Sequence, residues 1–302
     1  MRILKSALYR AINRWFLKGC TAYNPLSVRR SCRSKAQARA RFAAQGIPHA
    51  EGKVFFNPWQ AHRFAREHGF PLVIKPNVSG FSRGSHFPIT NYGQLWKAAL
   101  AAKLWWPTTV VERYLEGHNY RVLVGNGEII SVLRRHPPFV VGDGRRTIAQ
   151  LIDAENQIRQ AMGLYPVIHP IPKDRRIRRH LKAQGLSLAS VPEAGRRVTL
   201  FHRIALAPGG VVETIDKNHL PPENRALFLR ILALFEANIL GIDVIMEKGI
   251  EVPWRNQACI FLEVNSRPYV AMHHYPRFGE KEDLSAPLAR LEALAVDDTD
   301  VF

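Results

Sequence analysis

The 302-residue chain contains few cysteines and no long apolar run. Its three cysteines, Cys20, Cys32 and Cys259, lie far apart and lack the CxxC spacing of a zinc or redox site. A disulfide framework is therefore not expected, and a reducing, cytoplasmic setting fits this usage. No stretch of 18 or more residues is uninterruptedly apolar, which excludes an obvious transmembrane helix. With 46% hydrophobic residues, the chain can still bury the core of one large or two modest domains.

Acidic residues are also scarce, because 25 Asp and Glu stand against 43 Lys and Arg and leave a net charge of +18. This balance favours anionic partners such as a nucleotide, an acidic substrate, a nucleic acid or a membrane surface. No aromatic RNA-binding strand and no zinc-finger spacing is present, so nucleic acid is not expected among the partners.

The N-terminal segment is also basic, and residues 1–30 are expected to form an appendage to the rest of the chain. Within residues 1–18, apolar residues recur at helical spacing and are interrupted by five Lys and Arg. The absence of an uninterrupted apolar region argues against a secretory signal. A basic amphipathic helix of this kind could lie on an anionic membrane, but docking on its own domain is the favoured interpretation.

The remaining pattern alternates helical and strand segments and predicts an α+β protein. Helices are expected at residues 34–45, 58–68, 92–104, 147–162 and 223–238, with a peripheral helix after 280. Strands are expected at residues 54–56, 71–76, 108–114, 120–124, 128–134, 242–246 and 259–264. Ser34 is a candidate N-cap, and Gly125-Asn126-Gly127 is a strong hairpin signal. Residues 163–200 are irregular and basic and predict a flap.

A metal site is indicated by the strand that runs into Pro268. Glu263 and Asn265 stand two residues apart, so they share one face of that strand. Asp243, in the preceding predicted strand, offers a third oxygen. Carboxylate and amide oxygens suit Mg²⁺ held against a phosphate. The alternative is an acid on the solvent-facing side of an ordinary surface strand.

A phosphate site is indicated by Lys75, which ends an apolar strand, and by the Gly- and Ser-rich residues 77–85 that follow. Small residues allow backbone N–H groups to approach phosphate oxygens, and a lysine adds a point charge. The segment is not a Walker A loop, which requires GxxxxGK[ST]. An ordinary surface turn is the alternative.

Arginines on neighbouring strands are candidates for stabilising a transferring phosphoryl group. Arg121 and Arg135 occupy such positions, as does Arg203 further along the chain. The pair Gly209-Gly210 could admit a substrate carboxylate against backbone amides. The densest basic run, residues 173–180, is either a solvated face or a grip on an acidic substrate.

Taken in order, these segments resemble the ATP-grasp superfamily, and in particular the ATP-grasp domain of cyanophycin synthetases and the ligase half of bifunctional glutathione synthetases. The segments that carry the resemblance are Val111-Glu112, Gly117, Tyr120 to Val124, Arg134-Arg135, Val140 to Gly144, Leu188 to Gly195, Gly241 to Asp243 and Glu263 to Asn265. The fold that the resemblance implies has two α+β lobes, residues 31–109 and 110–302, which grip ATP. It has a basic lid at residues 145–200 and lacks a full N-terminal domain before the ATP-binding lobe.

The resemblance also implies roles for individual residues. The residues expected to hold the phosphates of ATP are Lys35, Lys75, Ser79, Gly80, Ser82 and Gly84. Those expected at the adenine and ribose are Glu112, Leu115 and Asn119. Those expected to bind Mg²⁺, with Mn²⁺ as an alternative ion, are Asp243, Glu263 and Asn265. Catalytic roles are expected for Arg121 and Arg203, and substrate contacts for Arg135, Gly209 and Gly210.

The activity implied is that of an ADP-forming carboxylate–amine ligase, which joins an amino acid or small peptide through an acylphosphate. An acidic substrate would match the basic flap. The alternative is a degenerate module that binds nucleotide or an anionic surface without ligating anything. A protein partner or a second copy of the chain could complete the acceptor site.

Overall fold

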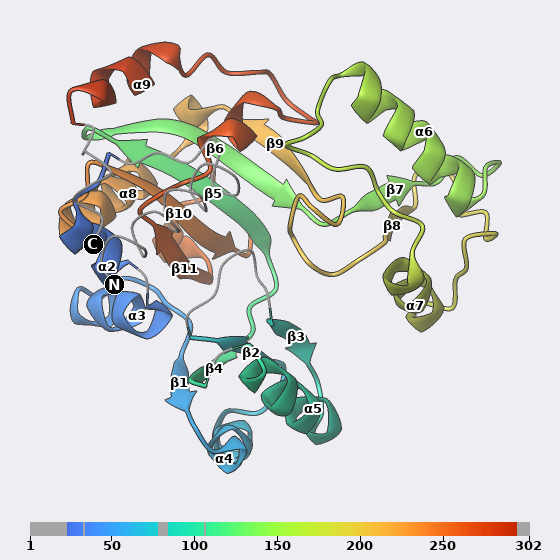
Figure 1. The fold of residues 1–302 in the computed structure, drawn as a ribbon, viewed down its shortest axis with the longest axis horizontal. Coiled ribbons are helices and arrows are strands. Elements are labelled where there is room, and N and C mark those ends of the chain that lie inside the picture. Colours follow the sequence, from blue (N-terminus) through green and yellow to red (C-terminus); the bar gives the residue numbers. More distant parts are fainter. Residues whose placement is uncertain (1–22, 33, 78–83, 106, 295–302) are drawn as a thin grey trace, which may run out of the picture. The chain divides into compact units, whose positions relative to one another are not determined.

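The computed structural model describes residues 23–32, 34–77, 84–105 and 107–294 as an α+β fold built on antiparallel sheets (Figure 1). It divides into two compact units. The first comprises Met1–Val132, Ile215–Val270 and Asp283–Phe302, and the second comprises Leu133–Thr214 and Ala271–Glu282. The first unit contains strands of both expected lobes, so the lobe division stays a prediction. No helix in the described part of the chain is long and apolar enough to span a membrane.

A four-stranded sheet in the first unit has the strand order β1-β4-β2-β3. Its strands are β1 (Gly52–Phe55), β4 (Thr109–Arg113), β2 (Leu72–Pro76) and β3 (His86–Ile89). Two helices, α4 (Pro58–His68) and α5 (Tyr92–Lys103), pack on it around a core that includes Phe55, Leu72 and Leu95. Asn57 and Gln60 form a capping box that starts α4 at the expected residue. Strand β3 was not expected from the sequence.

A five-stranded sheet has the strand order β11-β10-β5-β6-β9. Its strands are β11 (Cys259–Asn265), β10 (Ile239–Met246), β5 (His118–Gly125), β6 (Glu128–His136) and β9 (Val211–Ile215). The boundary between the two units falls within β6 and at the end of β9. Asn126 and Gly127, with φ of 49° and 75°, make the tight turn between β5 and β6. Such positive φ values are what a two-residue hairpin requires, so the predicted hairpin is confirmed.

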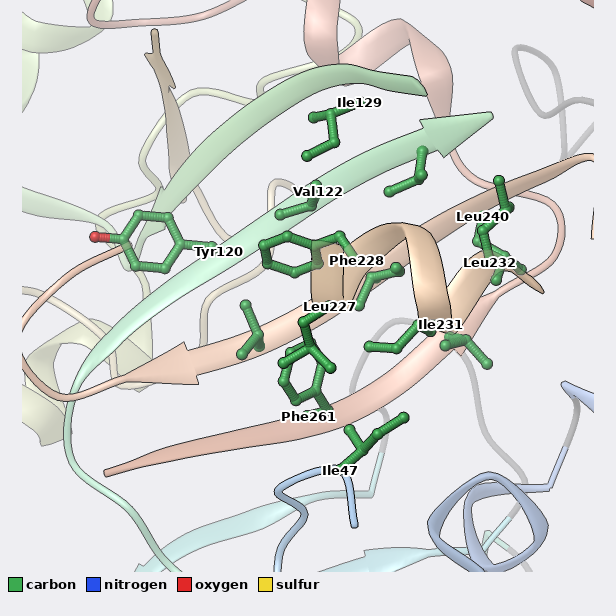
Figure 2. Close-up of a cluster of buried hydrophobic side chains, with 14 of the residues drawn as sticks. Ile47, Tyr120, Val122, Ile129, Leu227, Phe228, Ile231, Leu232, Leu240 and Phe261 are labelled. Carbon is green, nitrogen blue, oxygen red and sulfur yellow. The ribbon is translucent and has the colours of Figure 1, made fainter. Parts of the chain in front are cut away.

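The main core of the first unit lies between this sheet and the helices α3 (Lys35–Ala44) and α8 (Pro222–Leu234). Every second residue of β5, from Tyr120 to Val124, faces this core, and Figure 2 shows Phe228 of α8 among them. Each fully buried side chain of this size stabilises the fold by about 1.5–3 kcal/mol. The alternation leaves the intervening residues of β5 on the opposite face.

Short elements complete the first unit. These are α2 (Leu26–Ser31), α9 (Ser285–Glu292) and the 3₁₀ turns Lys217–His219 and Trp254–Asn256. The buried side chain of Asn24 donates hydrogen bonds to the backbone oxygens of Ile239 and Ser266, at 2.6 and 2.7 Å. Asn24 thereby ties the described end of the expected appendage to β10 and β11; residues 1–22 lie outside the described residues.

The second unit holds a two-stranded sheet and two helices. These elements are β7 (Phe139–Val141), β8 (Arg197–Thr199), α6 (Ile148–Ala161) and α7 (Arg175–Ala183), with a 3₁₀ turn at Val270–His274 at its edge. The prediction that residues 163–200 are irregular is therefore wrong. Helix α7 buries only Ile177 and Leu181, and its many charges obscured that spacing. Strand β8 exists through pairing with the distant β7, which no local pattern reveals.

Candidate functional site

Three of the residues expected at the site form one row across adjacent strands of the five-stranded sheet. Asp243 on β10 lies directly opposite Arg121 on β5 and Glu263 on β11. Residues directly opposite each other in antiparallel strands share a face, so the three side chains project together. Asn265 lies two residues beyond Glu263 and opposite Gly241, on that same face. The main core lies on the other face of the sheet, and a second hydrophobic cluster, which includes Leu123 and Ile239, packs on part of the face that carries the site.

Arg121 and Asp243 are joined as a buried ion pair. The Arg121 guanidinium donates Nε to Asp243 Oδ1 and Nη2 to Oδ2, the latter at 3.0 Å. Only 7% of Arg121 and 3% of Asp243 is exposed. A Cβ at Gly241 would come within 3.1 Å of Arg121 Nη1, so the glycine leaves room for the guanidinium. This two-point contact holds the orientation of Arg121.

Lys35 meets the second carboxylate of the row. Its Nζ lies 3.4 Å from Glu263 Oε2. Lys35 is the first residue of α3, and its backbone N–H donates to the backbone oxygen of Asn77 at 3.4 Å, while Ala36 N–H donates to Asn77 Oδ1 at 3.2 Å. Asn77 follows Lys75 by two residues. The start of α3 therefore lies against both the end of β2 and the row on β11.

Lys75 and Glu112 are brought together at the other sheet of the first unit. Lys75 Nζ lies 2.5 Å from Glu112 Oε2, and Arg39 Nη1 on α3 lies 3.0 Å from Oε1. All three side chains are largely buried. A Cβ at Gly52 would come within 2.5 Å of Glu112 Cγ, so this glycine makes room for the carboxylate. Arg39 was not among the expected site residues, because only the packing of α3 places it beside β4.

The remaining expected nucleotide contacts are distributed over loops and strand ends. Leu115 is half-buried after β4, and Asn119 is buried on β5, on the same face as Arg121. Gly84 has a φ of 72°, a left-handed conformation that favours glycine. Ser79, Gly80 and Ser82 lie outside the described residues.

The substrate-side residues expected from the sequence belong to the second unit. Arg135 is half-buried near the end of β6, and Arg203 is half-buried in the loop after β8. Burial, together with the charge of Arg176, lowers the pKa of Arg203.

The pair Gly209-Gly210 has a structural explanation of its own. Gly209 has a φ of 93°, and a Cβ at Gly210 would lie 2.4 Å from the backbone oxygen of Ala205. The N–H groups of Gly209 and Gly210 donate to the backbone oxygens of Leu206 and Ala205, at 3.0 and 2.9 Å. Because both amides are already engaged within the loop, the carboxylate pocket expected from them does not fit this geometry.

A hydrogen-bond network around the buried His136, next to Arg135, was not expected from the sequence. Arg197 Nη2 donates to His136 Nδ1 at 3.2 Å, because a guanidinium can only donate. His136 therefore carries its proton on Nε2 and donates it to Glu213 Oε2 at 2.8 Å. Burial lowers the pKa of His136, and Arg197 and Arg134 add to this effect, while the hydrogen bond to Glu213 opposes it. His136 adjoins an arginine pair in the sequence, but Arg197 and Glu213 are distant along the chain.

Comparison with known proteins provides an independent view of the fold. The chain is 34% identical over 258 residues to the cyanophycin synthetase of Trichormus variabilis, a segment that covers 84% of this chain and 28% of that synthetase. The crystal structure of a bifunctional glutathione synthetase from Pasteurella multocida superposes with a TM-score of 0.63 and 22% identity, over 89% of this chain and 37% of that one. The ATP-grasp ligase PsnB, bound to Mg and ADP, superposes with a TM-score of 0.52 and 16% identity, over 97% and 67%.

The chain has the ATP-grasp fold. It is a homologue of cyanophycin synthetases and spans little more than a quarter of their length, as the 28% coverage shows. No protein-family model matches it. The resemblance seen in the sequence is confirmed at the level of homology and fold, and the roles of individual residues remain predictions.

The ATP-grasp fold implies a nucleotide and a divalent metal, and the polar row offers suitable groups. Asp243, Glu263 and Asn265 present two carboxylates and an amide on one face, which are the hard oxygen donors that Mg²⁺ prefers. The Glu263 side chain is 33% exposed and therefore accessible to an ion. Among the residues that the structure describes, no three His, Cys, Asp or Glu gather to hold a metal. The proposed set contains only two such residues, with the amide as the third ligand.

Proposed function

We propose that the chain is an ADP-forming, ATP-dependent carboxylate–amine ligase that acts on an amino acid or small peptide. The observation that carries this proposal is the row Arg121–Asp243–Glu263, with Asn265 beside it on the same face of the sheet. Its homology to a cyanophycin synthetase supports the same class of reaction.

The proposed reaction proceeds in two steps. An oxygen of the substrate carboxylate attacks the γ-phosphorus of ATP, the bond from that phosphorus to the bridging oxygen breaks, and ADP leaves an acylphosphate. The amine then attacks the acyl carbon and loses a proton as the C–N bond forms and phosphate departs. Positioning and charge neutralisation supply most of the catalysis in phosphoryl transfer.

The residues of the first unit would divide these tasks among them. Lys35 and Lys75 would hold the phosphates, and Glu112 and Leu115 would meet the adenine while Asn119 meets the ribose. Asp243, Glu263 and Asn265 would hold Mg²⁺, which when bound neutralises charge on the phosphates. Arg121, oriented by Asp243, would stabilise the phosphoryl group that is being transferred. In the second unit, Arg203 would take a catalytic role and Arg135 would contact the substrate.

A nucleotide-binding module without ligase activity is the second candidate. The observation that favours it is that both carboxylates of the proposed metal set are paired with cations, Asp243 with Arg121 and Glu263 with Lys35. In such a module, the two ion pairs would take the place of a bound metal ion. The two candidates differ in whether adding a substrate causes ADP to be released from ATP.

Release of ADP and phosphate with ATP, Mg²⁺ and pooled amino acids and dipeptides tests the proposal. We expect substrate-dependent release that Glu263→Ala abolishes and that Glu247→Ala, a control at an exposed glutamate just after β10, retains. Release that is insensitive to Glu263→Ala would contradict the metal role. ATP binding without release in any pool would favour the binding module.

A further inference from the structure

Helix α7 presents a stripe of four cations on one face. The members of this cationic stripe are Arg175, Arg178, Arg179 and Lys182, all exposed. They are spaced three, four and seven residues from the first, so they lie on the same side of the helix. The apolar face, Ile177 and Leu181, is buried in the core of the second unit. The helix is therefore held in place with its charges outward.

No acidic side chain in the described part of the chain pairs with the cationic stripe. The nearby acids are engaged elsewhere: Asp174 caps α7 and pairs with Arg176, and Asp153 pairs with Lys173. Four like charges on one helix face repel one another by a few tenths of a kcal/mol per neighbouring pair. Within the described residues, no ion pair offsets this repulsion, as is typical of a surface that binds an anion.

The flank of α7 contacts the segment that carries a proposed catalytic residue. The His180 ring lies 6.5 Å from the ring of Phe201 and 6.0 Å from that of His202, and the Arg176 guanidinium stands 5.9 Å above Phe201. Arg203 follows directly, and the charge of Arg176 reaches it. A ligand bound at Arg203 thus has α7 as its neighbour within the same unit.

We propose that the cationic stripe of α7 binds an extended acidic peptide. Arg175 and Lys182 are about 10 Å apart along the axis at 1.5 Å per residue, a span that about four residues of extended peptide cover. A carboxylate on successive or alternate residues would then meet successive cations. The idea that this peptide is a substrate rests on the proposed ligase function. The proposal that the peptide binds to the stripe does not depend on that function.

An acidic peptide fits this surface better than a membrane does. A helix that lies on a membrane inserts an exposed apolar face, and the apolar face of α7 is buried. The stripe is also short, matching a peptide of a few residues. A single-stranded nucleic acid is the competing polyanion that the experiment must separate.

The test is fluorescence anisotropy of the full chain with labelled glutamate peptides of two, four and eight residues, and with an eight-residue glutamine peptide. The variant replaces Arg175, Arg178, Arg179 and Lys182 by Gln. Its matched control replaces Lys53, Arg63, Arg66 and Lys97, four exposed cations of the first unit, and so removes the same charge. A dodecamer of deoxythymidine provides the nucleic-acid arm.

We expect tight binding from four glutamates upward, no binding of the glutamine peptide, and a loss of about tenfold or more in the α7 variant alone. If both variants lost the same amount of peptide affinity, the effect would come from net charge alone, and the proposal would be overturned. Tighter binding of the dodecamer, lost in the same variant, would assign the stripe to nucleic acid instead. ADP release with neutral substrates, measured in parallel, tests the ligase function separately. If no ADP is released, the ligase proposal fails, and the binding measurements alone still decide whether α7 binds the peptide.

Discussion

Arg121 and Asp243 bind each other across β5 and β10 through two hydrogen bonds, in a setting where both are buried. The same two residues were expected to bind phosphate and metal. Their pairing compensates each of the two buried charges within the fold. It also means that a change in one residue alters the environment of the other.

Replacement of one partner in this pair should be costly. Arg121→Met removes the cation that pairs with the buried Asp243 carboxylate, and should lower the free energy of unfolding by about 3–5 kcal/mol, as should Asp243→Ala. The double variant should cost clearly less than the sum. Urea denaturation measures all three, and Arg290→Met, which removes an exposed pair with Glu128, should cost under about 1 kcal/mol. Additive costs would show that the two charges are not coupled.

Glu112 should stabilise the first unit as well as face the nucleotide. Glu112→Gln leaves Lys75 and Arg39 largely buried without a carboxylate, so the free energy of unfolding should fall by about 3 kcal/mol. Glu116→Gln, a control at a nearby exposed position, should change it by less than about 0.5 kcal/mol. Urea denaturation of both variants decides the matter. If Glu112→Gln and Glu116→Gln had equal free energies of unfolding, the cluster of Lys75, Arg39 and Glu112 would not be formed in solution.

Glu155 should make the stability of the second unit depend on pH. Burial opposes its ionisation, but hydrogen bonds from Arg277 and Arg159 outweigh burial and lower its pKa below the ordinary 4.5. The unfolded state then binds the proton more readily, so the stabilisation is complete well above pH 4.5 and is lost as the pH falls through the lower pKa of the folded state. The difference in unfolding free energy between the wild type and Glu155→Gln should shrink over that range.

Urea denaturation at a series of pH values from 7 to 3 measures this difference. Glu193→Gln, at an exposed glutamate of the same unit, is the control and should show no such narrowing. A gap between wild type and Glu155→Gln that stays constant down to pH 3 would contradict the argument.

Cys259 reports on the strand that carries Glu263 and Asn265. Burial raises the pKa of its thiol to about 11, so almost no thiolate exists at pH 8. Iodoacetamide should therefore modify Cys259 far more slowly in the folded protein than in urea, as read by peptide mass mapping. ATP with Mg²⁺ should slow it further if the ligand stabilises β11. Labelling at the rate of a free thiol would show that β11 opens readily.

Local signals were enough to predict most elements, for identifiable reasons. The capping residues Ser34 and Asn57 and the Asn126-Gly127 turn act within a few residues, so the sequence alone indicates them. Sequence patterns missed the strands β3, β7, β8 and β9. β7 pairs with the distant β8, and β9 pairs with the distant β6, whereas β3 pairs with the preceding strand β2. The predicted helix at 223–238 ends earlier, at Leu234, because Glu236 adopts a positive φ of 52°.

For the candidate site, strand periodicity by itself determined that Glu263 and Asn265 share a face, because alternation is a property of any strand. Only the tertiary structure decided that Arg121, Asp243 and Glu263 form one row, since strand order and register depend on long-range pairing, including a bulge after Asp243. It also decided that Arg39 joins Glu112 and that Glu213 joins His136. Those contacts arise from packing between segments far apart in the chain, which spacing along the sequence does not encode.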